Sequence, residues 1–529
     1  MSIKDLFEFD IASNEFELLE SEKGEPSYFG TFHDAKPKQE PKEDEEIPES
    51  IDGIKDRFKK EFHTDINSDI VTRSFYMGSK LRTMAVFVKG MSDDRLINEF
   101  ILRDAMQSVK VDELTASRED IVEFCISNVF AMGESEKEKS FLKIKRGILD
   151  GKCAIFFDGA KSAVLIDARG YEKRAITPPQ NEKVVRGPHE GFTENLRTNI
   201  TLLRRILRVE DLVFEFRNSG GDNHLTVAIA YRKDVANETL VEEVKRRLSK
   251  VDTRLIIADG MLEQLTEKRG LSPFPQVLST ERPDRVASAL MEGQVAVLLD
   301  GSPYANIMPT TLSALMTSAE DIYLRKPQGS VIRTIRFMGA LLSIVTPAII
   351  LALSTFHQGL LSTEMLATLI TSRVMVFVPM GFEMLFLLLV FQLIREAGLR
   401  VAGGISQAVG IIGGLILGQA AVTANLVSSV VLIVVALTGL GNFCIPDYST
   451  QIGAVYLRLL LVMASWIGGL LGFTCVLVVI IADIARMKSF GIPFLSPFAP
   501  KTASRHPFML RGKLKMHMRA DDYMNTQEE

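Results

Sequence analysis

An apolar stretch from residue 331 to residue 484 constrains the fold of this chain more than any other feature. It holds nearly all of the long apolar runs and almost no charge. Five candidate membrane segments can be separated within it, at residues 337–353, 374–394, 408–424, 426–445 and 457–484. A bilayer core of roughly 30 Å takes about 20 mostly apolar helical residues to cross. A soluble core could supply one such run, but five in succession predict a polytopic helical membrane domain with four to six segments over residues 329–486.

Charge is distributed unevenly along the chain. The first 50 residues contain 15 Asp and Glu against 5 Lys, which gives −10, so the rest of the chain carries +5 of the overall −5. Such a segment cannot bury enough apolar surface to offset its ordering entropy, and residues 1–50 are therefore predicted to be a disordered acidic tail. The first 30 residues have no apolar signal-peptide core, which indicates that the N-terminal part stays in the cytoplasm.

Two α/β units are predicted before the apolar stretch. Residues 51–168, here called domain 1, alternate buried-strand patterns with helical periods, and residues 191–328, here called domain 2, do the same. Residues 148–159 and 290–301 share an acidic residue followed by glycine, then an apolar run, then Asp-Gly. This internal echo predicts two related cytoplasmic α/β domains. The polar residues 169–190 between them are predicted to be a linker.

The basic residues around the apolar stretch predict its orientation. Residues 486–519 carry eight Lys or Arg and no acidic residue, and Arg333 and Arg336 lie at the other end. Positive charge next to membrane segments marks the cytoplasmic side, so both ends should lie inside and the number of crossings should be even. Five candidate segments conflict with that requirement. One of them must be re-entrant, interfacial or miscounted, and we suspect the two glycine-rich runs between residues 408 and 445.

The C-terminal residues 487–529 are predicted to form a basic cytoplasmic tail. Phenylalanines at positions 490, 494, 498 and 508 are interleaved with its basic residues. A pattern of this kind also occurs in nucleic-acid-binding segments. Next to a membrane segment, however, it indicates a surface that binds anionic lipid headgroups, and no nucleic-acid partner is predicted.

Polar residues inside the apolar stretch are the candidate site, because hydrocarbon penalises them. Each of them could either face an ion pathway or bond a neighbouring helix. For the carboxylate of Glu383 the two interpretations are evenly balanced. Arg458 is expected to extend its guanidinium to a headgroup. The candidate ion-pathway residues are Glu383, Gln407, Gln419, Asn425, Asn442 and Asp447.

Three glycines in the same region repeat at a helical spacing. Gly410, Gly414 and Gly418 lie at i, i+4 and i+8, which would let another helix approach closely. Helix packing is the favoured interpretation of this stripe, and a pore-lining or hinge role is the alternative.

Histidines and cysteines, which often act in catalysis or bind metals, do not occur at the spacings of known catalytic or metal-binding motifs. The seven histidines form no H-x-x-x-H or H-E-x-x-H motif, and the four cysteines form no C-x-x-C pair. Neither a P-loop nor a G-x-S-x-G elbow is present. We therefore predict that the chain is not an enzyme, and no cofactor or metal site is expected.

Several longer motifs resemble a known family. The chain is similar to the A subunits of spore germinant receptors, the GerA family of endospore-forming bacteria, over roughly residues 60–500. The matching stretches begin at Gly191, Ser272, Thr280 and Glu292 in the soluble part, at Arg395, Gln407, Gly418 and Val434 in the apolar part, and at Phe490 after it.

This resemblance implies a subunit of a nutrient receptor in the spore inner membrane. Such a subunit works with a transporter-like B subunit, where the family binds nutrient, and with a lipoprotein C subunit. The A subunits are thought to form a ring, a pentamer, that releases monovalent cations when germinant binds. These expectations come from the resemblance alone.

The chain departs from the family pattern at residues 373–379. There it reads Arg-Val-Met-Val-Phe-Val-Pro, where the family usually has a short Arg-Glu-Gly-x-Pro-Phe-Pro entry. The following helix is also more apolar than the family's, which puts a pore role for that helix in doubt. Two alternatives to a channel subunit stay open: a membrane-anchored sensor or scaffold that does not conduct, and a sporulation-stage paralogue of the A subunits that amplifies ion release.

Overall fold

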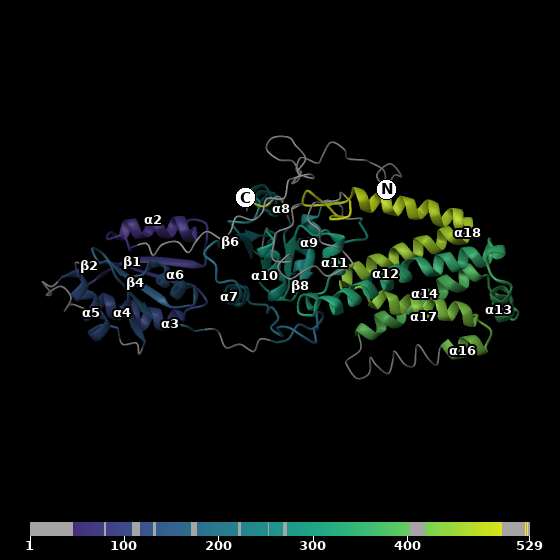
Figure 1. The fold of residues 1–529 in the computed structure, drawn as a ribbon, viewed down its shortest axis with the longest axis horizontal. Helices are drawn as coiled ribbons and strands as arrows, with labels where there is room; N and C mark the ends of the chain where they lie inside the picture. Colours follow the sequence, from purple (N-terminus) through teal and green to yellow (C-terminus); the bar gives the residue numbers. More distant parts are fainter. Residues whose placement is uncertain are drawn as a thin grey trace.

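The computed structural model describes residues 46–78, 81–107, 117–130, 134–170, 177–220, 224–251, 253–267, 272–400, 418–499, 524 and 526. Figure 1 shows an elongated molecule with domain 1 at one end, domain 2 in the middle and a bundle of helices at the other end. Ile47 is buried against domain 1, so this domain begins slightly before residue 51.

Domain 1 is a five-stranded antiparallel sheet with the strand order β1-β2-β4-β5-β3. Helices α2 and α6 cover one face, and the segment α3–α4 together with α5 covers the other. Ser50 caps the start of α2 by accepting a hydrogen bond from the amide of Gly53. The elements are α2 (Ile51–Phe62), β1 (Ile70–Met77), β2 (Leu81–Val88), α3 (Asp94–Leu96), the π-helix η2 (Ile97–Leu102), α4 (Arg103–Gln107), α5 (Arg118–Asn128), β3 (Ser135–Glu138), α6 (Phe141–Leu149), β4 (Cys153–Phe157) and β5 (Ala163–Ile166).

Domain 2 repeats this plan element for element. Its strand order is β6-β7-β9-β10-β8, with α7 and α10 on one face and α8 and α9 on the other. The sequence echo falls on equivalent pieces, α6–β4 in domain 1 and α10–β9 in domain 2. The elements are α7 (Leu196–Ile206), β6 (Leu212–Ser219), β7 (Leu225–Arg232), α8 (Glu238–Ser249), α9 (Asp259–Thr266), β8 (Leu278–Thr280), α10 (Pro283–Met291), β9 (Val295–Leu299), β10 (Ala305–Met308), α11 (Leu312–Met316) and the 3-10 turn η4 (Ala319–Ile322).

The helical bundle begins at domain 2 and returns to it. Its elements are α12 (Lys326–Thr355), η5 (Gln358–Leu360), α13 (Thr363–Arg373), α14 (Met380–Arg400), α16 (Gly418–Thr423), α17 (Ser429–Phe443) and α18 (Tyr448–Arg486). Among the described residues, α12 and α18 are long and apolar enough to cross a membrane, and α17 is a shorter apolar helix. Many large apolar side chains on these helices are exposed, as on Leu389, Leu471 and Val478. A surface of this kind is suited to lipid rather than to water.

Helix α18 is a hairpin rather than one straight rod. Its backbone leaves the helical conformation at Gly469, where φ is 58° and ψ is −141°. A Cβ placed on Gly472 would lie 2.3 Å from the carbonyl oxygen of Ala464, which is possible only if the chain folds back between these residues. The prediction that residues 457–484 form a single membrane segment is therefore wrong. At 1.5 Å per residue, the first arm, residues 448–468, extends about 30 Å.

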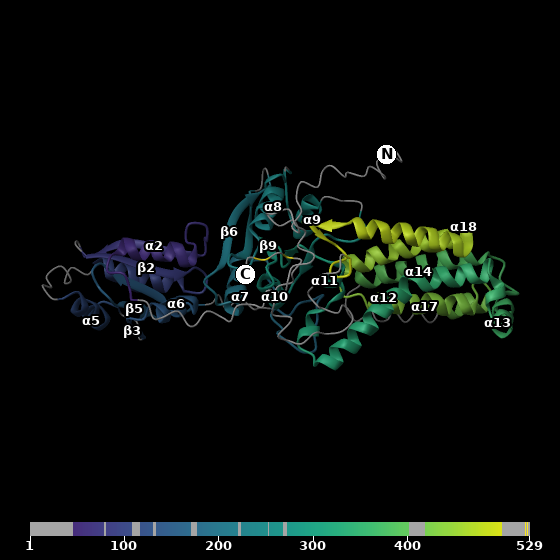
Figure 2. The ribbon, with the colours of Figure 1, turned by 45° about the horizontal axis from the view of Figure 1, so that its top comes forward.

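The segment after α18 packs into domain 2. Strands β11 (Lys488–Ser489) and β12 (Ile492–Pro493) form a short hairpin beside α9, shown in yellow in Figure 2. Phe490 and Ile492 join the core under α8 and α9, and Phe494 joins the core under α7 and α10. The prediction that Phe490 and Phe494 face lipid headgroups is therefore wrong, because domain 2 buries both rings completely. Residues 501–519, which carry most of the basic charge of the tail, lie outside the described residues.

The turn at Gly469 generates a stability prediction. Gly469→Ala should destabilise the protein by at least about 1–2 kcal/mol, because a side chain in the left-handed region is strained and its Cβ would lie 2.9 Å from Phe356. Gly468→Ala is the matched control, since a Cβ at Gly468 has nothing within 4 Å. Thermal unfolding of the two purified variants in detergent compares them. Equal melting temperatures would contradict the hairpin.

Candidate functional site: polar residues of the bundle and its junction with domain 2

Glu383 lies in the first turn of α14 and is almost fully buried. Its Oε1 accepts hydrogen bonds from the amide and the hydroxyl of Ser428, the residue that caps α17, with the hydroxyl at 2.7 Å. Its Oε2 lies 3.6 Å from Nε of Arg373. The carboxylate therefore sits at the positive N-terminal end of α17 and ties α14 to α17.

The other predicted pathway residues are dispersed. Asn442 is buried in α17 and its Oδ1 has no hydrogen-bond partner among the described residues. Asp447 caps α18 by accepting a hydrogen bond from the amide of Thr450 at 2.6 Å. Gln419 is exposed on α16, and Asn425 is exposed in the following turn with a φ of 53°. Glu383 and Asp447 lie at opposite ends of the bundle, and the residues between them are not brought together at one place. An ion pathway lined by all of these residues therefore stays a prediction.

The predicted glycine stripe is only partly described. Gly418 starts α16, where an added Cβ would lie in ordinary contact with Leu432 at 3.5 Å. Gln407, Gly410 and Gly414 lie outside the described residues. A close helix approach in the described bundle is instead made by glycines of α12 and α17. A Cβ on Gly441 would lie only 2.4 Å from the carbonyl oxygen of Gly339.

Arg458 is buried in the bundle, so the prediction that it reaches a headgroup is wrong. Only 1% of the residue is exposed, and its Nη1 donates to Oγ of Ser343 on α12 at 3.0 Å. Its Nε has no hydrogen-bond partner among the described residues. Apolar periodicity could not reveal this position, because the same periodicity fits a lipid-facing arginine.

A buried carboxylate joins domain 2 to the first long apolar helix. Asp321 is fully buried in η4 and pairs with Arg333 at 3.0 Å and with Arg336 at 2.9 Å, both on α12. It also accepts a hydrogen bond from the amide of Ser318, which fixes η4. These two arginines, predicted only as a basic flank, therefore set the direction in which α12 leaves domain 2.

The motif that begins at Thr280 clamps the linker onto domain 2. Glu281 accepts hydrogen bonds from the amide of Gln180 and from the hydroxyl of Tyr304. Arg282 is fully buried and donates to the carbonyl oxygen of Pro188 at 3.0 Å. Arg285 pairs with Glu182 at 2.6 Å. Residues 177–190 of the linker are thus fixed against domain 2.

Tyr323, just before α12, contacts both domain 2 and the linker. Its hydroxyl donates to Asp284 in α10, and its ring lies directly against Gly187 of the linker. A Cβ on Gly187 would approach that ring to 2.7 Å. The linker, α10 and the start of the bundle therefore meet at one tyrosine.

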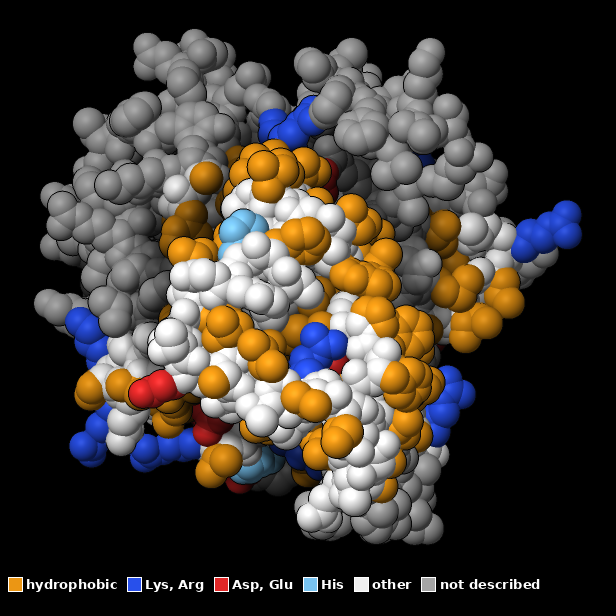
Figure 3. Space-filling model, turned by 90° about the vertical axis from the view of Figure 1, so that its right-hand side faces the viewer, with side chains coloured by type: hydrophobic (Ala, Val, Ile, Leu, Met, Phe, Trp, Pro, Cys, Tyr) orange, Lys and Arg blue, Asp and Glu red, His pale blue; other side chains and the backbone are white. Residues whose placement is uncertain are grey.

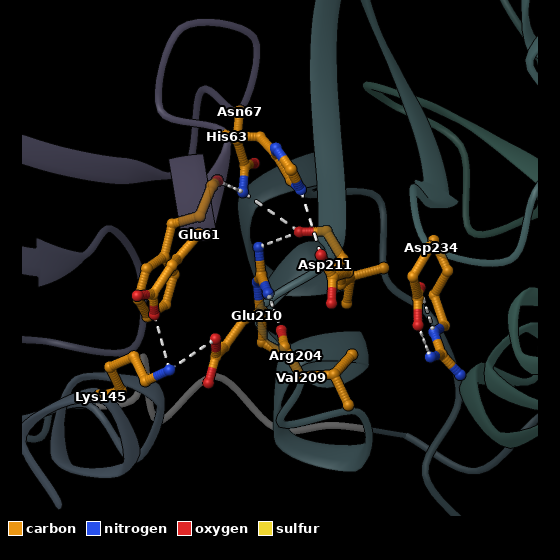
Figure 4. A network of polar contacts seen from close by, with 12 residues as sticks. Glu61, His63, Asn67, Lys145, Arg204, Val209, Glu210, Asp211 and Asp234 are labelled. Atoms are coloured by element: carbon orange, nitrogen blue, oxygen red, sulfur yellow. Dashed lines mark hydrogen bonds and ion pairs between the residues drawn. The ribbon is translucent and has the colours of Figure 1, made fainter. Parts of the chain in front are cut away.

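Domains 1 and 2 are joined by a polar interface, shown in Figure 4. Arg204 of α7 and Asp69 form a fully buried two-point ion pair, with Nε to Oδ2 at 2.7 Å and Nη2 to Oδ1 at 3.1 Å. Asn67 bonds two backbone groups of β6, and Lys145 bridges Glu61 of domain 1 and Glu210 of domain 2. A buried charge pair of this kind holds the domains in one register.

Acidic residues gather where α9 approaches the start of α18. The pKa of Glu263 is raised to about 8, first by burial and then by the negative charges of Glu267, Asp447 and Asp259, in that order. Asp259 is held by the hydroxyls of Ser279 and Ser302. Among the described residues, no group of acidic, histidine or cysteine side chains has the arrangement of a metal site.

Comparison with known proteins identifies the family. The chain matches the family described as Bacillus/Clostridium GerA spore germination protein over residues 56–522, and it belongs to that family. It is 32% identical to spore germination protein KA of Bacillus subtilis strain 168 over 82% of this chain and 79% of that protein. It is 34% identical to spore germination protein GerLA of Bacillus cereus over 80% of this chain and 85% of that protein.

A solved structure is also similar to part of the chain. The N-terminal domain of the A subunit of the Bacillus megaterium spore germinant receptor GerK3 aligns with 50% of this chain and 96% of its own length. The sequence identity is 25% and the TM-score is 0.39. Membership of the family gives the chain a role in spore germination, and the family together with the two long apolar helices indicates an association with a membrane.

The interdomain ion pair generates a second prediction. Asp69→Asn should destabilise the protein by about 3–5 kcal/mol, because it leaves the buried charge of Arg204 unpaired. Asp52→Asn is the control, since Asp52 pairs with Arg82 at an exposed position. Denaturant unfolding of the full-length variants compares them. A midpoint for Asp69→Asn equal to that of the control would show that the pair does not hold the domains together.

Glu263 generates a third prediction, on pH dependence. Its folded pKa of about 8 exceeds the ordinary value of 4.5, so the neutral acid stabilises the fold at pH 4.5 and below, and this stabilisation is lost as the pH rises through 8. Glu263→Gln should remove this loss, so that the variant melts higher than the wild type at pH 9 and similarly at pH 5. Melting temperatures at both pH values provide the measurement. A constant difference between the two proteins would contradict the assignment.

Proposed function

We propose that this chain is the A subunit of a nutrient germinant receptor in the spore inner membrane. The observation that carries the proposal is the family match over residues 56–522, which includes both soluble domains and the apolar bundle. In this role the chain acts without catalysis, alongside a transporter-like B subunit and a lipoprotein C subunit. The relatives named above support this, because their names describe germination rather than an enzymatic reaction.

The bundle is proposed to cross the membrane several times with both ends in the cytoplasm. The hairpin at Gly469 supports this, because the last of the five apolar runs then makes two passes. If each of the others crosses once, the number of crossings is even. Helix α12 leaves domain 2 at Asp321, and the segment after α18 re-enters domain 2 at Phe490, so the chain before and after the bundle meets on one side.

Five copies of the subunit are proposed to form a ring that conducts monovalent cations when germinant binds. Exposed apolar side chains on α12, α14 and α18 provide surfaces for neighbouring subunits and for lipid. Rigid attachment of the bundle to domain 2 supports gating, because a movement of the soluble part would be passed to α12 through Asp321 and to α18 through the segment after it.

Two experiments test the proposal. Deletion of the gene in a sporulating host should abolish or delay potassium release on exposure to the nutrient that this receptor recognises. Purified protein reconstituted with its partner subunits in liposomes should then carry a germinant-dependent cation flux. If the deletion impairs potassium release from spores but the reconstituted protein carries no cation flux in liposomes, the membrane-anchored scaffold or the amplifying paralogue is favoured. Unchanged potassium release in the deletion strain under every nutrient would contradict a receptor subunit.

Glu383 generates a prediction on ion release. Glu383→Gln should change the rate of cation release, because the carboxylate either lines the path or ties α14 to Ser428 at the start of α17. Glu396→Gln, an exposed change on the same helix, should leave the rate unchanged.

The melting temperature of the Glu383→Gln protein separates the two roles of Glu383. A changed rate with unchanged melting indicates the path, whereas a changed rate with a lower melting temperature indicates the tie between helices. A rate and a melting temperature both equal to those of the wild type would contradict both roles.

A further inference from the structure

The segment between α12 and α14, residues 356–379, leaves large apolar side chains uncovered at the end of the bundle remote from domain 2. Figure 3 faces this end, where apolar side chains, in orange, are spread over the described surface and charged side chains are few. No residue of α13 is buried. We call this segment the outer cap. Its exposed large apolar residues are Phe356, Leu360, Met365, Ile370, Val374, Met375 and Phe377.

The loop after α13 is held in place with its apolar side chains pointing outward. Nη2 of Arg373 donates to the carbonyl oxygen of Val378 at 3.0 Å, which closes the loop between them. Nε of the same arginine lies 3.6 Å from Oε2 of Glu383 on α14. The loop is therefore anchored to the bundle, yet Met375 is 73% exposed and Phe377 is 80% exposed.

Helix α13 has an apolar side and a polar side. Met365, Leu366, Leu369 and Ile370 follow the spacing i, i+1, i+4 and i+5, which places them along one side of the helix. The opposite side carries Glu364, Thr368 and Thr371, all exposed. Arg373 lies on the same side as the apolar residues, and Leu366 and Leu369 are half-buried. The exposed apolar side chains of the cap, rather than an amphipathic pattern in α13, therefore point to a membrane surface.

Two contacts place the outer cap at the boundary of the apolar bundle. The ring of Phe356 packs against the turn at Gly469, and the ring of Trp466 packs against Gly381 at the start of α14. Helix α12 runs about 30 Å from the ion-paired Arg336 to its end before Phe356, close to the thickness of a bilayer core. The cap therefore lies one bilayer thickness from the Asp321 junction, and Trp466 lies at the level where tryptophans gather in membrane proteins.

We propose that α13 and the loop at residues 374–378 lie in the outer interface of the bilayer, with the loop inserted among the acyl chains. This inference rests on the proposed function in one respect, that the bundle crosses a membrane. The partner is the lipid surface itself, bound through apolar burial rather than through a charged headgroup. Besides His357, the acidic and basic residues of the cap are Glu364 and Arg373, and Arg373 is already engaged with Glu383.

The apolar surface of the cap continues onto the side of the bundle, and we take lipid as the occupant of both. The exposed loop adjoins the first turns of α14, where Phe382 and Phe386 stack in parallel and are also exposed. These rings extend the apolar surface of the cap down the side of the bundle. A protein partner for the cap would also have to cover α13, whose polar side carries Glu364 outward.

Single-tryptophan fluorescence in vesicles tests the proposal. The chain has one tryptophan, so Trp466→Phe provides a background without indole emission. Phe377→Trp in that background, reconstituted in phosphatidylcholine vesicles, should emit at short wavelength. Phosphatidylcholine with brominated acyl chains should quench it strongly, whereas aqueous iodide should quench it several-fold less than it quenches Thr368→Trp on the polar side of α13. Met375→Trp serves in the same way if Phe377→Trp does not fold.

A third position separates this proposal from the membrane assignment of the bundle. Val478→Trp, exposed in the second arm of α18, should be quenched by the brominated lipid if the bundle crosses the bilayer. If Val478→Trp is quenched while Phe377→Trp is quenched by iodide as strongly as Thr368→Trp, only the inserted loop is refuted. If Phe377→Trp is shielded from both quenchers, a protein covers the cap and the lipid assignment is overturned. If Val478→Trp is quenched by iodide and not by the brominated lipid, the membrane assignment itself fails.

Discussion

The buried carboxylate of Asp321 is the interaction on which the arrangement of the molecule depends. It belongs to the last turn of domain 2, and both of its oxygens are engaged by arginines of α12. A charge with no access to water must keep its partners, since the loss of one leaves the other uncompensated. The first long apolar helix is therefore fixed in direction at its base, and the helices packed on α12 inherit that direction.

Duplication of the α/β unit explains how the soluble half reaches the bundle. The two sheets have the same strand order, but their surroundings differ. In domain 1 the sheet is closed by its own helices, whereas domain 2 takes Phe490, Ile492 and Phe494 from beyond the last apolar helix to complete its cores. Domain 2 also receives the linker through Glu281 and Arg282. The second copy has thus become the connecting piece between domain 1 and the helices.

Sequence patterns could predict the elements but not the pairs that join them. Buried strands such as β7 and helices such as α8 have a strong periodicity, and the apolar runs are long, so both classes are visible without a structure. Asp69 and Arg204 are 135 residues apart, and each alone resembles an ordinary surface charge. Arg458 likewise fits a lipid-facing position as well as a buried one. The turn at Gly469 cannot be predicted from hydropathy, because a glycine within an apolar run gives the same pattern whether the helix continues or reverses.

The short hairpin after α18 has a consequence for the order in which the chain matures. Phe494 is made after every apolar helix, and domain 2 has a gap in its core until that ring arrives. A nascent chain therefore holds an unfinished domain 2 while the helices of the bundle are made, and the core of this domain is complete only when the C-terminal segment returns. Domain 1 has no such dependence and completes its own cores first. The core of domain 2 is thus completed only after the whole bundle has been synthesised.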